Sequence, residues 1–208
     1  MIKLLVVDNH PIVRKGLELL FITSPQIQVV GGVNNGEAIF DFLKQHPVDI
    51  ILSEIDLPKL NGITALRRLR KEFPQVKTII FSAQPEEIYA INTIKSGAEG
   101  YLMKTVDIMT IKEAILKVYE GSVYLSNEIA DQMSSKKRGT RTGSYYKKLS
   151  MREIEVLKLL ASGRKNKQIA LELDINEKTV STYKARLMKK LNVSNIVDLI
   201  SRAKLLEL

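Results

Sequence analysis

The first 120 residues alternate five times between a short apolar run and a longer segment with helical periodicity, and this alternation constrains the fold more than any other feature. Each apolar run is rich in β-branched residues and is followed by polar or turn residues, as expected of parallel strands buried on both faces. The runs are Ile2–Val7, Ile27–Val30, Val48–Leu52, Lys77–Phe81 and Gly100–Met103. The helical segments are Pro11–Phe21, Glu37–Leu43, Ile63–Phe73, Glu86–Ser96 and Ile108–Tyr119. Five βα units in succession predict an α/β domain with a doubly wound, five-stranded parallel sheet.

The composition changes after the fifth unit, and a second domain follows. Residues 134–148 read SSKKRGTRTGSYYKK, a basic stretch with Gly and Ser and no apolar period, which predicts a flexible linker. Helical patterns return in the last 60 residues. We therefore divide the chain into an α/β domain at 1–122, a linker at 123–147 and an all-α domain at 148–208.

The pattern of the all-α domain indicates two short helices joined by a tight turn. Ser150, with Glu153 three residues later, forms a capping-box signature at the start of the domain's first helix. Asn166 is suited to cap the next helix, and residues 174–176 form a turn before an amphipathic, basic helix at 177–191. Two helices in this arrangement, the second of them basic, are typical of a DNA-binding helix-turn-helix.

The net charge of +9 is confined to one part of the chain. Residues 1–125 hold 14 basic and 14 acidic side chains, whereas residues 126–208 hold 18 basic and 9 acidic ones. An even spread of charge would indicate an ordinary solvated surface. A neutral part joined to a basic part indicates instead that the basic part meets a polyanion.

The composition also excludes several classes of protein. The chain has no cysteine, so it carries no disulfide, thiolate metal site or cysteine nucleophile, and this fits the reducing cytoplasm. The N-terminal apolar run is short and is interrupted by Asp8, unlike a signal peptide. No apolar stretch approaches the ~20 residues of a membrane helix. We therefore expect a cytoplasmic protein with no membrane partner.

Four polar residues stand at the carboxyl ends of predicted strands. They are Asp8 after the first strand, Glu54 after the third, Ser82 after the fourth and Lys104 after the fifth. In a parallel sheet these positions converge at one edge, where functional groups gather. Carboxylates there suit a hard divalent cation such as Mg²⁺, and a hydroxyl and an ammonium beside them suit the oxygens of a phosphoryl group.

On these motifs, residues 1–120 resemble the receiver domains of bacterial two-component response regulators, which have a flavodoxin-like fold. VVDNHP resembles the family's acidic first-strand motif, GYLMKT carries its lysine, and E-x-x-L-P followed by Gly62 resembles the loop after its phosphorylation site. The resemblance assigns metal binding to Asp8, Asn9 and Glu54. It assigns switching and phosphoryl binding to the hydroxyl of Ser82, the aromatic ring of Tyr101 and the ammonium of Lys104.

Two positions depart from the receiver pattern. The family's phospho-acceptor is an aspartate four residues before the proline, but that position here is Glu54, and the second acidic metal position is Asn9. Asp56 is only two residues before Pro58, not four, and we expect it to lie outside the acid pocket. Because glutamate is one methylene longer than aspartate, Glu54 is either a permanent mimic of the phosphorylated form or an inactive substitute. Asn9 removes one negative charge, so we expect Mg²⁺ to bind more weakly than in the family at large.

The all-α domain resembles the LuxR-type helix-turn-helix of the NarL/FixJ class of regulators. The match runs along LSMREIEVLKLLASGRKNKQIALELDINEKTVSTYKARLMKKLNVSN, and TVSTYKARLMKKL is close to the BvgA/EvgA-like branch. We expect Val180, Leu187 and Leu191 to form a buried stripe, which leaves the other side of the basic helix for the major groove. The predicted groove contacts are Lys178, Thr179, Ser181, Thr182, Lys184, Ala185 and Arg186. The predicted phosphate contacts are Lys165, Asn166 and Lys167.

The two resemblances imply a DNA-binding transcriptional response regulator rather than an enzyme. Its expected partners are double-stranded DNA, a second copy of the chain, and a sensor histidine kinase that Glu54 bypasses if it acts as a mimic. Family dimers form through receiver helices, and the last helix offers an apolar face for a second contact. That face comprises Ile196, Leu199, Ile200 and Ala203.

Two other functions stay open at this point. One is an enzyme of flavodoxin-like fold, such as a phosphatase or a nucleotide-binding protein, although the sequence has no phosphate-binding loop motif. The other is an adaptor whose basic helical tail binds an acidic protein.

Overall fold

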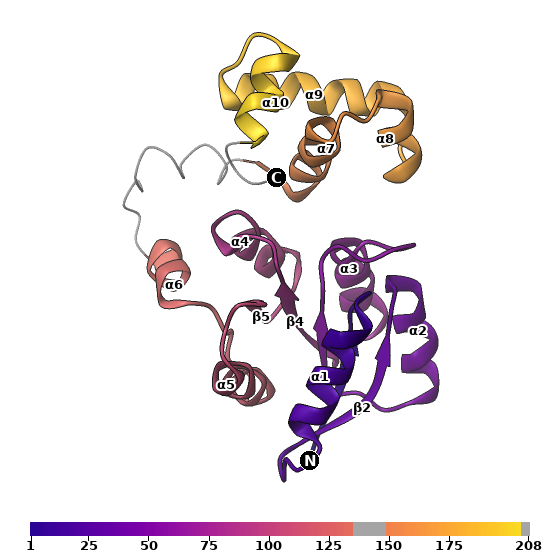
Figure 1. The fold of residues 1–208 in the computed structure, drawn as a ribbon, viewed down its shortest axis with the longest axis vertical. Helices are drawn as coiled ribbons and strands as arrows, with labels where there is room; N and C mark the ends of the chain where they lie inside the picture. The colour runs from indigo at the N-terminus through magenta and orange to yellow at the C-terminus, as the bar shows by residue number, and fades with distance from the viewer. Residues whose placement is uncertain (135–148, 205–208) are drawn as a thin grey trace. The chain divides into compact units, whose positions relative to one another are not determined.

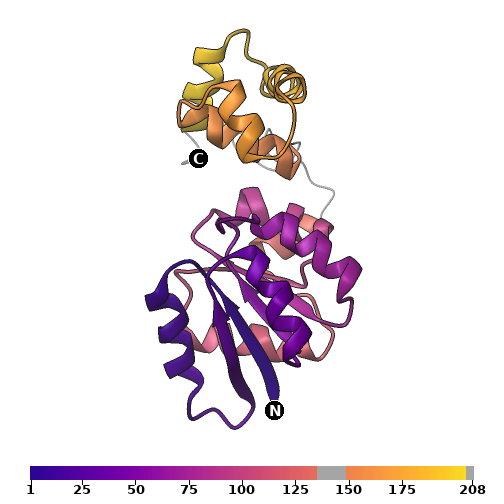
Figure 2. The ribbon, with the colours of Figure 1, turned by 90° about the vertical axis from the view of Figure 1, so that its right-hand side faces the viewer.

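The computed structural model describes residues 1–134 and 149–204, and the chain divides into two compact units, Met1–Lys136 and Lys137–Leu208. The first is a sheet covered by helices, and the second is a group of helices (Figures 1 and 2). No helix within the described ranges is both long enough and apolar enough to cross a membrane.

The first unit is built on a parallel sheet of five strands, which confirms the predicted fold class. The strands are β1 (Ile2–Val7), β2 (Ile27–Val33), β3 (Ile50–Ser53), β4 (Lys77–Ser82) and β5 (Gly100–Met103). They lie in the order β2-β1-β3-β4-β5, and every neighbouring pair is parallel. The strand order reverses at β1 and β3, and functional groups of open α/β sheets gather at the carboxyl ends of strands beside such a reversal.

Helices cover both faces of this sheet and create two separate apolar cores. They are α1 (Pro11–Phe21), α2 (Gly36–Gln45), α3 (Gly62–Glu72), α4 (Glu86–Ser96) and α5 (Ile108–Tyr119). α1 and α5 pack on one core, and α2 and α3 pack on the other. Alternation along β1 divides its side chains between the two, with Val6 in the first core and Val7 in the second. Burial on both faces is why the strands read as nearly continuous apolar runs.

A short segment after α5 extends the first unit beyond the predicted elements. The backbone N–H of Tyr124 donates to the Glu99 carbonyl (2.8 Å), and the Tyr124 carbonyl accepts from the N–H of Tyr101 on β5 (3.0 Å). A helix that we did not predict, α6 (Asn127–Ser134), follows and packs on α4, with Ile129 fully buried. This helix lies within the predicted linker, and the rest of that linker, residues 135–147, lies outside the described residues.

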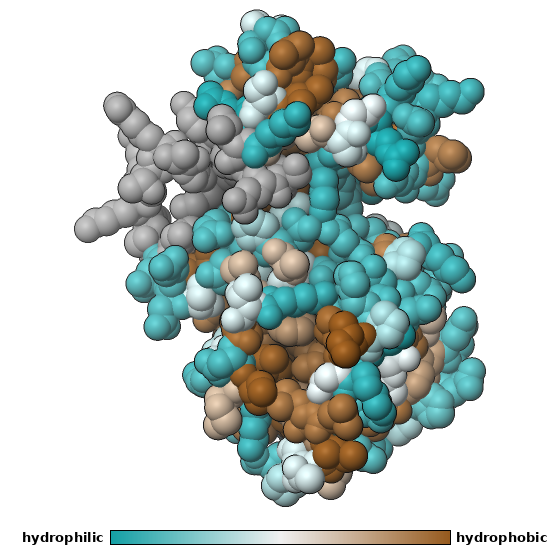
Figure 3. All heavy atoms as spheres, in the orientation of Figure 1, coloured by the Kyte–Doolittle hydropathy of each residue, from teal (hydrophilic) through white to brown (hydrophobic). Residues whose placement is uncertain are grey.

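The surface of the first unit carries apolar side chains that its cores do not use. In the space-filling view, apolar residues gather over part of this unit, whereas hydrophilic residues cover much of the second (Figure 3). α1 and the residue after it leave Ile12, Leu19 and Ile22 exposed. Exposed apolar side chains are a feature of surfaces that contact other proteins where they form a contiguous patch.

The second unit contains four described helices around one apolar core. They are α7 (Met151–Ala161), α8 (Asn166–Glu172), α9 (Glu177–Leu191) and α10 (Ile196–Lys204). The capping box of Ser150 and Glu153 is present, as predicted, but the cap of α8 is Lys165, and Asn166 is that helix's first residue. The buried stripe of α9 is confirmed, since Val180, Leu187 and Leu191 are each at most 1% exposed.

The apolar face of α10 belongs mostly to this core. Leu199 and Ala203 are fully buried within the unit, so the prediction that they are free to contact a second copy is wrong. The prediction failed because periodicity identifies an apolar face but not what covers it. Val197, on the other side of the helix, is exposed.

An ion pair between a half-buried lysine and a buried carboxylate joins the start of α7 to the end of α9. Lys190 Nζ lies 2.7 Å from Glu153 Oε2, and Glu153 is only 2% exposed. Burial raises the pKa of Glu153, but hydrogen bonds from Lys190 and Ser150 outweigh burial and hold that pKa below its ordinary value. The carboxylate therefore stabilises the folded domain in its ionised form.

We expect Leu187→Asp to unfold the second domain, because an unpaired carboxylate would replace a fully buried side chain. Ala185→Asp places the same charge at an exposed position of the same helix and should leave the domain folded. Hydrogen exchange of the α7 and α9 amides measures whether the domain is folded in each of the two variants. Protection that survives in the Leu187 variant contradicts the buried stripe.

The Glu153 pair also predicts a pH dependence. Because the folded-state pKa lies below the ordinary value of 4.5, the pair's contribution is complete above about pH 4.5 and is lost as pH falls through the folded-state pKa. Glu153→Gln should therefore lower the stability of the second domain by about 1 kcal/mol at neutral pH. The stabilities of the variant and the parent should converge in acid, as followed by hydrogen exchange. A difference that stays constant with pH argues against an ionised pair.

Candidate functional site

The first unit has an acid pocket at the carboxyl edge of its sheet. Asp8 follows β1, Glu54 follows β3, Ser82 ends β4 and Lys104 follows β5. The structure brings all four side chains together. Asp8 and Glu54 are 1% and 5% exposed, so both carboxylates lie almost entirely out of water.

The carboxylate of Glu54 is bound on both oxygens. Lys104 Nζ lies 2.8 Å from Glu54 Oε2 and 2.6 Å from Asp8 Oδ2, so one ammonium serves two carboxylates. The hydroxyl of Ser82 donates to Glu54 Oε1, which also accepts from the backbone N–H of Ile55 at 2.6 Å. Burial lowers the pKa of Lys104, but the hydrogen bonds and charges of Asp8 and Glu54 outweigh it and raise that pKa overall. The lysine is therefore a permanent cation at neutral pH.

The loop after Glu54 depends on a glycine. A side chain on Gly62 would place its Cβ 2.4 Å from the Glu54 carbonyl oxygen and 3.0 Å from the Cα of Ile55. The N–H of Gly62 donates to the Ile55 carbonyl at 2.9 Å. This close approach of two backbone segments fixes the main chain that carries the Glu54 carboxylate.

The other oxygen of Asp8 faces a residue that our sequence reading missed. His10 donates its backbone N–H to Asp8 Oδ1 at 2.8 Å, and its ring Nδ1 lies 3.1 Å from the same oxygen. An aspartate side chain can accept a hydrogen bond from the backbone N–H two residues later and so form a turn. The position of His10 two residues after Asp8 is the one sequence signal for this turn. Asn9, between them, is exposed.

A second missed residue, Gln84, connects the pocket with its neighbours. Its backbone N–H donates to Ser82 Oγ at 3.2 Å, and its carbonyl accepts from the hydroxyl of Tyr101 at 2.8 Å. Its side chain donates to Asp56 Oδ2 at 2.6 Å, and Asp56 itself is exposed, outside the pocket. Nothing in the sequence marks Gln84, because these contacts come from the path of the loop after β4.

Tyr101 lies inside the unit. It is 1% exposed, and burial, followed by the charge of Glu54, raises the pKa of its hydroxyl far above the ordinary value. The hydroxyl therefore stays protonated and remains a hydrogen-bond donor.

The second unit presents the basic surface predicted from the sequence. Within it, Asn166 Nδ2 donates to Ser181 Oγ at 3.2 Å, which joins the start of α8 to α9. The exposed members of the predicted set are Lys165, Lys167, Lys178, Ser181, Thr182, Ala185 and Arg186. The half-buried members are Asn166, Thr179 and Lys184.

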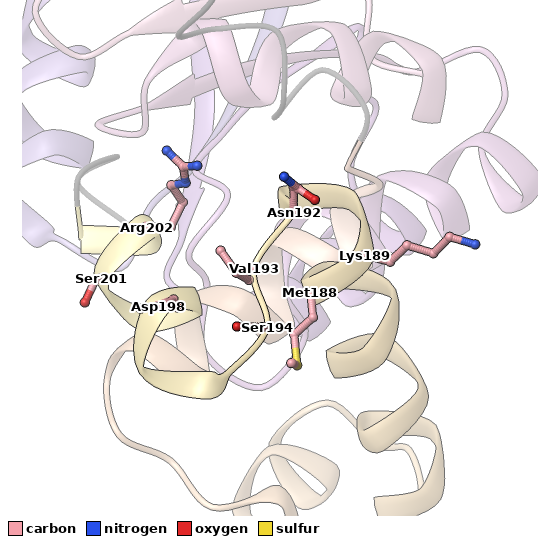
Figure 4. Close-up of a pocket in the computed structure, with 8 residues that line it drawn as sticks. All are labelled: Met188, Lys189, Asn192, Val193, Ser194, Asp198, Ser201 and Arg202. Atoms are coloured by element: carbon pink, nitrogen blue, oxygen red, sulfur yellow. The ribbon is translucent and has the colours of Figure 1, made fainter.

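An open cavity of about 630 Å³ lies between the end of α9 and α10 (Figure 4). It is lined by Met188, Lys189, Asn192, Val193, Ser194, Asp198, Ser201 and Arg202. Its lining contains none of the predicted DNA contacts, and the sequence analysis did not predict it. We assign it no role in the site.

Comparisons with known proteins match both units. Residues 4–116 match the response regulator receiver domain, and residues 147–203 match the bacterial regulatory proteins of the luxR family. The Fimbriae Z protein of Escherichia coli (strain K12) is 35% identical over 204 residues, which cover 98% of this chain and 97% of the relative. Response regulator UvrY of the same strain is 32% identical over 200 residues, covering 96% and 92%.

A solved structure shows the same fold. RcsB from Salmonella enterica serovar Typhimurium, bound to promoter rprA in the presence of phosphomimetic BeF3-, matches with a TM-score of 0.78. The match is 24% identical and covers 98% of this chain and 99% of that one.

Because the Lys104 ammonium is shared by two buried carboxylates, we expect its removal to have a large effect on stability. Lys104→Met should destabilise the first unit by about 3 kcal/mol, because two buried carboxylates would then face each other without a cation. In a Glu54→Gln background the same change should cost clearly less, since only one carboxylate remains. Urea unfolding of the parent, the two single variants and the double variant gives the coupling energy between the two positions. Additive effects contradict the ion pair.

Proposed function

Because the chain belongs to the response-regulator family, with a receiver domain and a LuxR-type DNA-binding domain of the NarL/FixJ class, we propose that it is a transcription factor whose receiver controls dimerisation and DNA binding. The proposed function is regulatory rather than enzymatic. Binding to the chromosome would place its action in the cytoplasm. The closer similarity to the BvgA/EvgA-like branch stays a prediction.

We propose further that Glu54 is a built-in substitute for a phosphorylated aspartate. The observation that carries this proposal is the binding of its carboxylate by both the ammonium of Lys104 and the hydroxyl of Ser82. These are the two groups that the family resemblance assigns to phosphoryl oxygens. Charge-assisted hydrogen bonds to a buried carboxylate are strong, so the resident side chain itself holds these groups in place. In this role Glu54 bypasses the sensor histidine kinase.

The pocket offers Mg²⁺ the oxygen ligands that this cation prefers, but few of them are free. The carboxylates of Asp8 and Glu54 both contact Lys104, and Asn9 supplies a neutral amide where the family has an acid. Asp8, Asn9 and Glu54 would hold the ion, and its chemistry would be to neutralise charge on phosphoryl oxygens. We propose that binding is weak for this reason.

The proposed role of Glu54 predicts the outcome of a labelling experiment. The parent chain should take up no stable phosphoryl group from acetyl phosphate and Mg²⁺, whereas Glu54→Asp should become labelled. DNA affinity should be high for the parent and for labelled Glu54→Asp, and low for unlabelled Glu54→Asp and for Glu54→Gln. Electrophoretic shift and mass spectrometry measure the two properties.

A matched control separates the alternatives. Asp56→Asn in the Glu54→Asp background should keep its label, because Asp56 lies outside the pocket. Stoichiometric labelling of the parent at Asp56 contradicts the proposal. Equal DNA affinity of the parent and unlabelled Glu54→Asp favours the inactive-substitute interpretation.

We propose that α9 enters the major groove and that the chain binds as a homodimer on two half-sites about one helical turn apart. The exposed Ile12, Leu19 and Ile22 of the first unit support a receiver contact between two copies. The basic residues around the start of α8, Lys165 and Lys167, are exposed and suited to phosphates.

Replacement of Lys184 or Arg186 by Ala should weaken DNA binding without unfolding the domain. Loss of a phosphate contact should weaken all sequences alike and reduce the salt dependence by roughly one unit of slope. Loss of a base contact should cost about 1–3 kcal/mol on the preferred site only. Fluorescence anisotropy across a salt titration distinguishes the two.

Lys71→Ala is the control, since it removes the same charge from an exposed position on α3, away from the proposed dimer contact. If Lys184→Ala, Arg186→Ala and the double variant all bind like the parent, the adaptor function replaces the transcription factor.

A further inference from the structure

The serine and threonine hydroxyl groups on the exposed face of α9 already form hydrogen bonds within the protein. Ser181 Oγ donates to the Glu177 carbonyl at 3.0 Å, and Thr182 Oγ1 donates to the Lys178 carbonyl at 3.0 Å. A hydroxyl has one proton, so neither group has a proton left for an acceptor on a base edge. Ser181 Oγ is engaged further, because it also accepts from Asn166.

The same is true in the first turn of the helix. Thr179 Oγ1 lies 2.9 Å from Asn176 Oδ1, which also accepts the Thr179 backbone N–H at 2.7 Å. Thr179 therefore takes part in the cap of α9, and its hydroxyl is hydrogen-bonded within the helix rather than available to a base edge.

What the middle of this face offers instead is methyl groups. Thr182 and Ala185 are both exposed and stand three residues apart, so they are neighbours on the helix surface. Because the Thr182 hydroxyl is turned to the preceding turn, its methyl group is the part available to a ligand. The Cβ atoms of such a pair lie roughly 5–6 Å apart, which corresponds to one or two steps of about 3.4 Å along a DNA strand.

Cations stand at both ends of this pair. Lys178 precedes Thr182 by four residues and Lys189 follows Ala185 by four, so all four share one face, and both lysines are exposed. The two lysines are about 16 Å apart along the helix axis, against a major groove about 12 Å wide. The stripe can therefore place ammonium groups near the phosphates on both walls of the groove and methyl groups at its floor.

On this arrangement, and resting on the proposed binding of α9 to DNA, we propose that Thr182 and Ala185 are specificity-determining residues that recognise the C5-methyl groups of two thymines. Thymine is the base whose major-groove edge carries a methyl group. The chemical class of the preferred ligand is thus duplex DNA with two thymines, one or two base pairs apart, in each half-site.

Deoxyuridine isolates this recognition, because it differs from thymidine only by the C5-methyl group. The full chain is used to select duplexes from a random library made with thymidine and from one made with deoxyuridine. Thymine should be enriched at two positions of each half-site selected from the first library, and uracil should not be enriched at the corresponding positions in the second. In a selected duplex, replacing either thymine with uracil should weaken binding about fourfold, which corresponds to about 0.8 kcal/mol for one buried methyl-sized group.

Variants assign each thymine to a side chain. Thr182→Ser removes the methyl group and keeps the hydroxyl, so it should abolish the thymine–uracil ratio at one position. Thr182→Val keeps a methyl group and loses the hydroxyl, so it should retain that ratio. Ala185→Gly should abolish the ratio at the other position, and a general weakening of the helix by glycine does not change a ratio between two ligands.

Equal binding of thymine and uracil duplexes by the parent overturns the proposal, as does a ratio that Thr182→Ser retains or Thr182→Val abolishes. Failure to enrich any duplex from either library overturns the proposed DNA binding itself, and this inference with it. Enrichment without a thymine preference overturns this inference alone.

Discussion

One ammonium group between two buried carboxylates organises the functional edge of the receiver. Lys104 contacts both Asp8 and Glu54 through its side chain, and its backbone N–H donates to the Ser82 carbonyl at 2.9 Å. The ends of β1, β3, β4 and β5 therefore meet around a single cation. Two carboxylates this deeply buried require such a partner, because an unpaired buried charge costs several kcal/mol. The geometry of the surrounding loops follows from that requirement.

From this pocket, hydrogen bonds continue to the segment that leaves the receiver. Glu54 is bound by Ser82, and Gln84 joins Ser82 to the hydroxyl of Tyr101. The backbone N–H of Tyr101 donates in turn to the carbonyl of Tyr124, which lies just before α6. A single residue, Tyr101, thus contacts both the loop beside the pocket and the start of the chain that leads toward the second unit.

The sequence was most informative where apolar or charged residues recur at regular places along the chain. Apolar runs predicted all five strands and the order of elements, and the stripe of Val180, Leu187 and Leu191 predicted the buried side of α9. Strand ends predicted which chemical groups would stand together at the pocket. The contacts of Gln84 and His10 escaped prediction because they depend on how a loop turns, which no periodicity encodes. The helix α6 was not predicted at all, because its residues were assigned to the linker. The burial of α10 was missed because an apolar pattern does not identify the surface that covers it.

The glutamate at the acceptor position has a consequence for timing. An aspartyl phosphate is a hydrolysable bond, so a regulator that carries one loses its signal at a rate set by chemistry. The side chain of Glu54 contains no such bond. In the proposed role, each copy would be active from the moment it folds until it is degraded or diluted by growth. The output would then follow the number of molecules in the cell, and control would lie with synthesis and turnover of the chain rather than with a cycle of phosphoryl transfer.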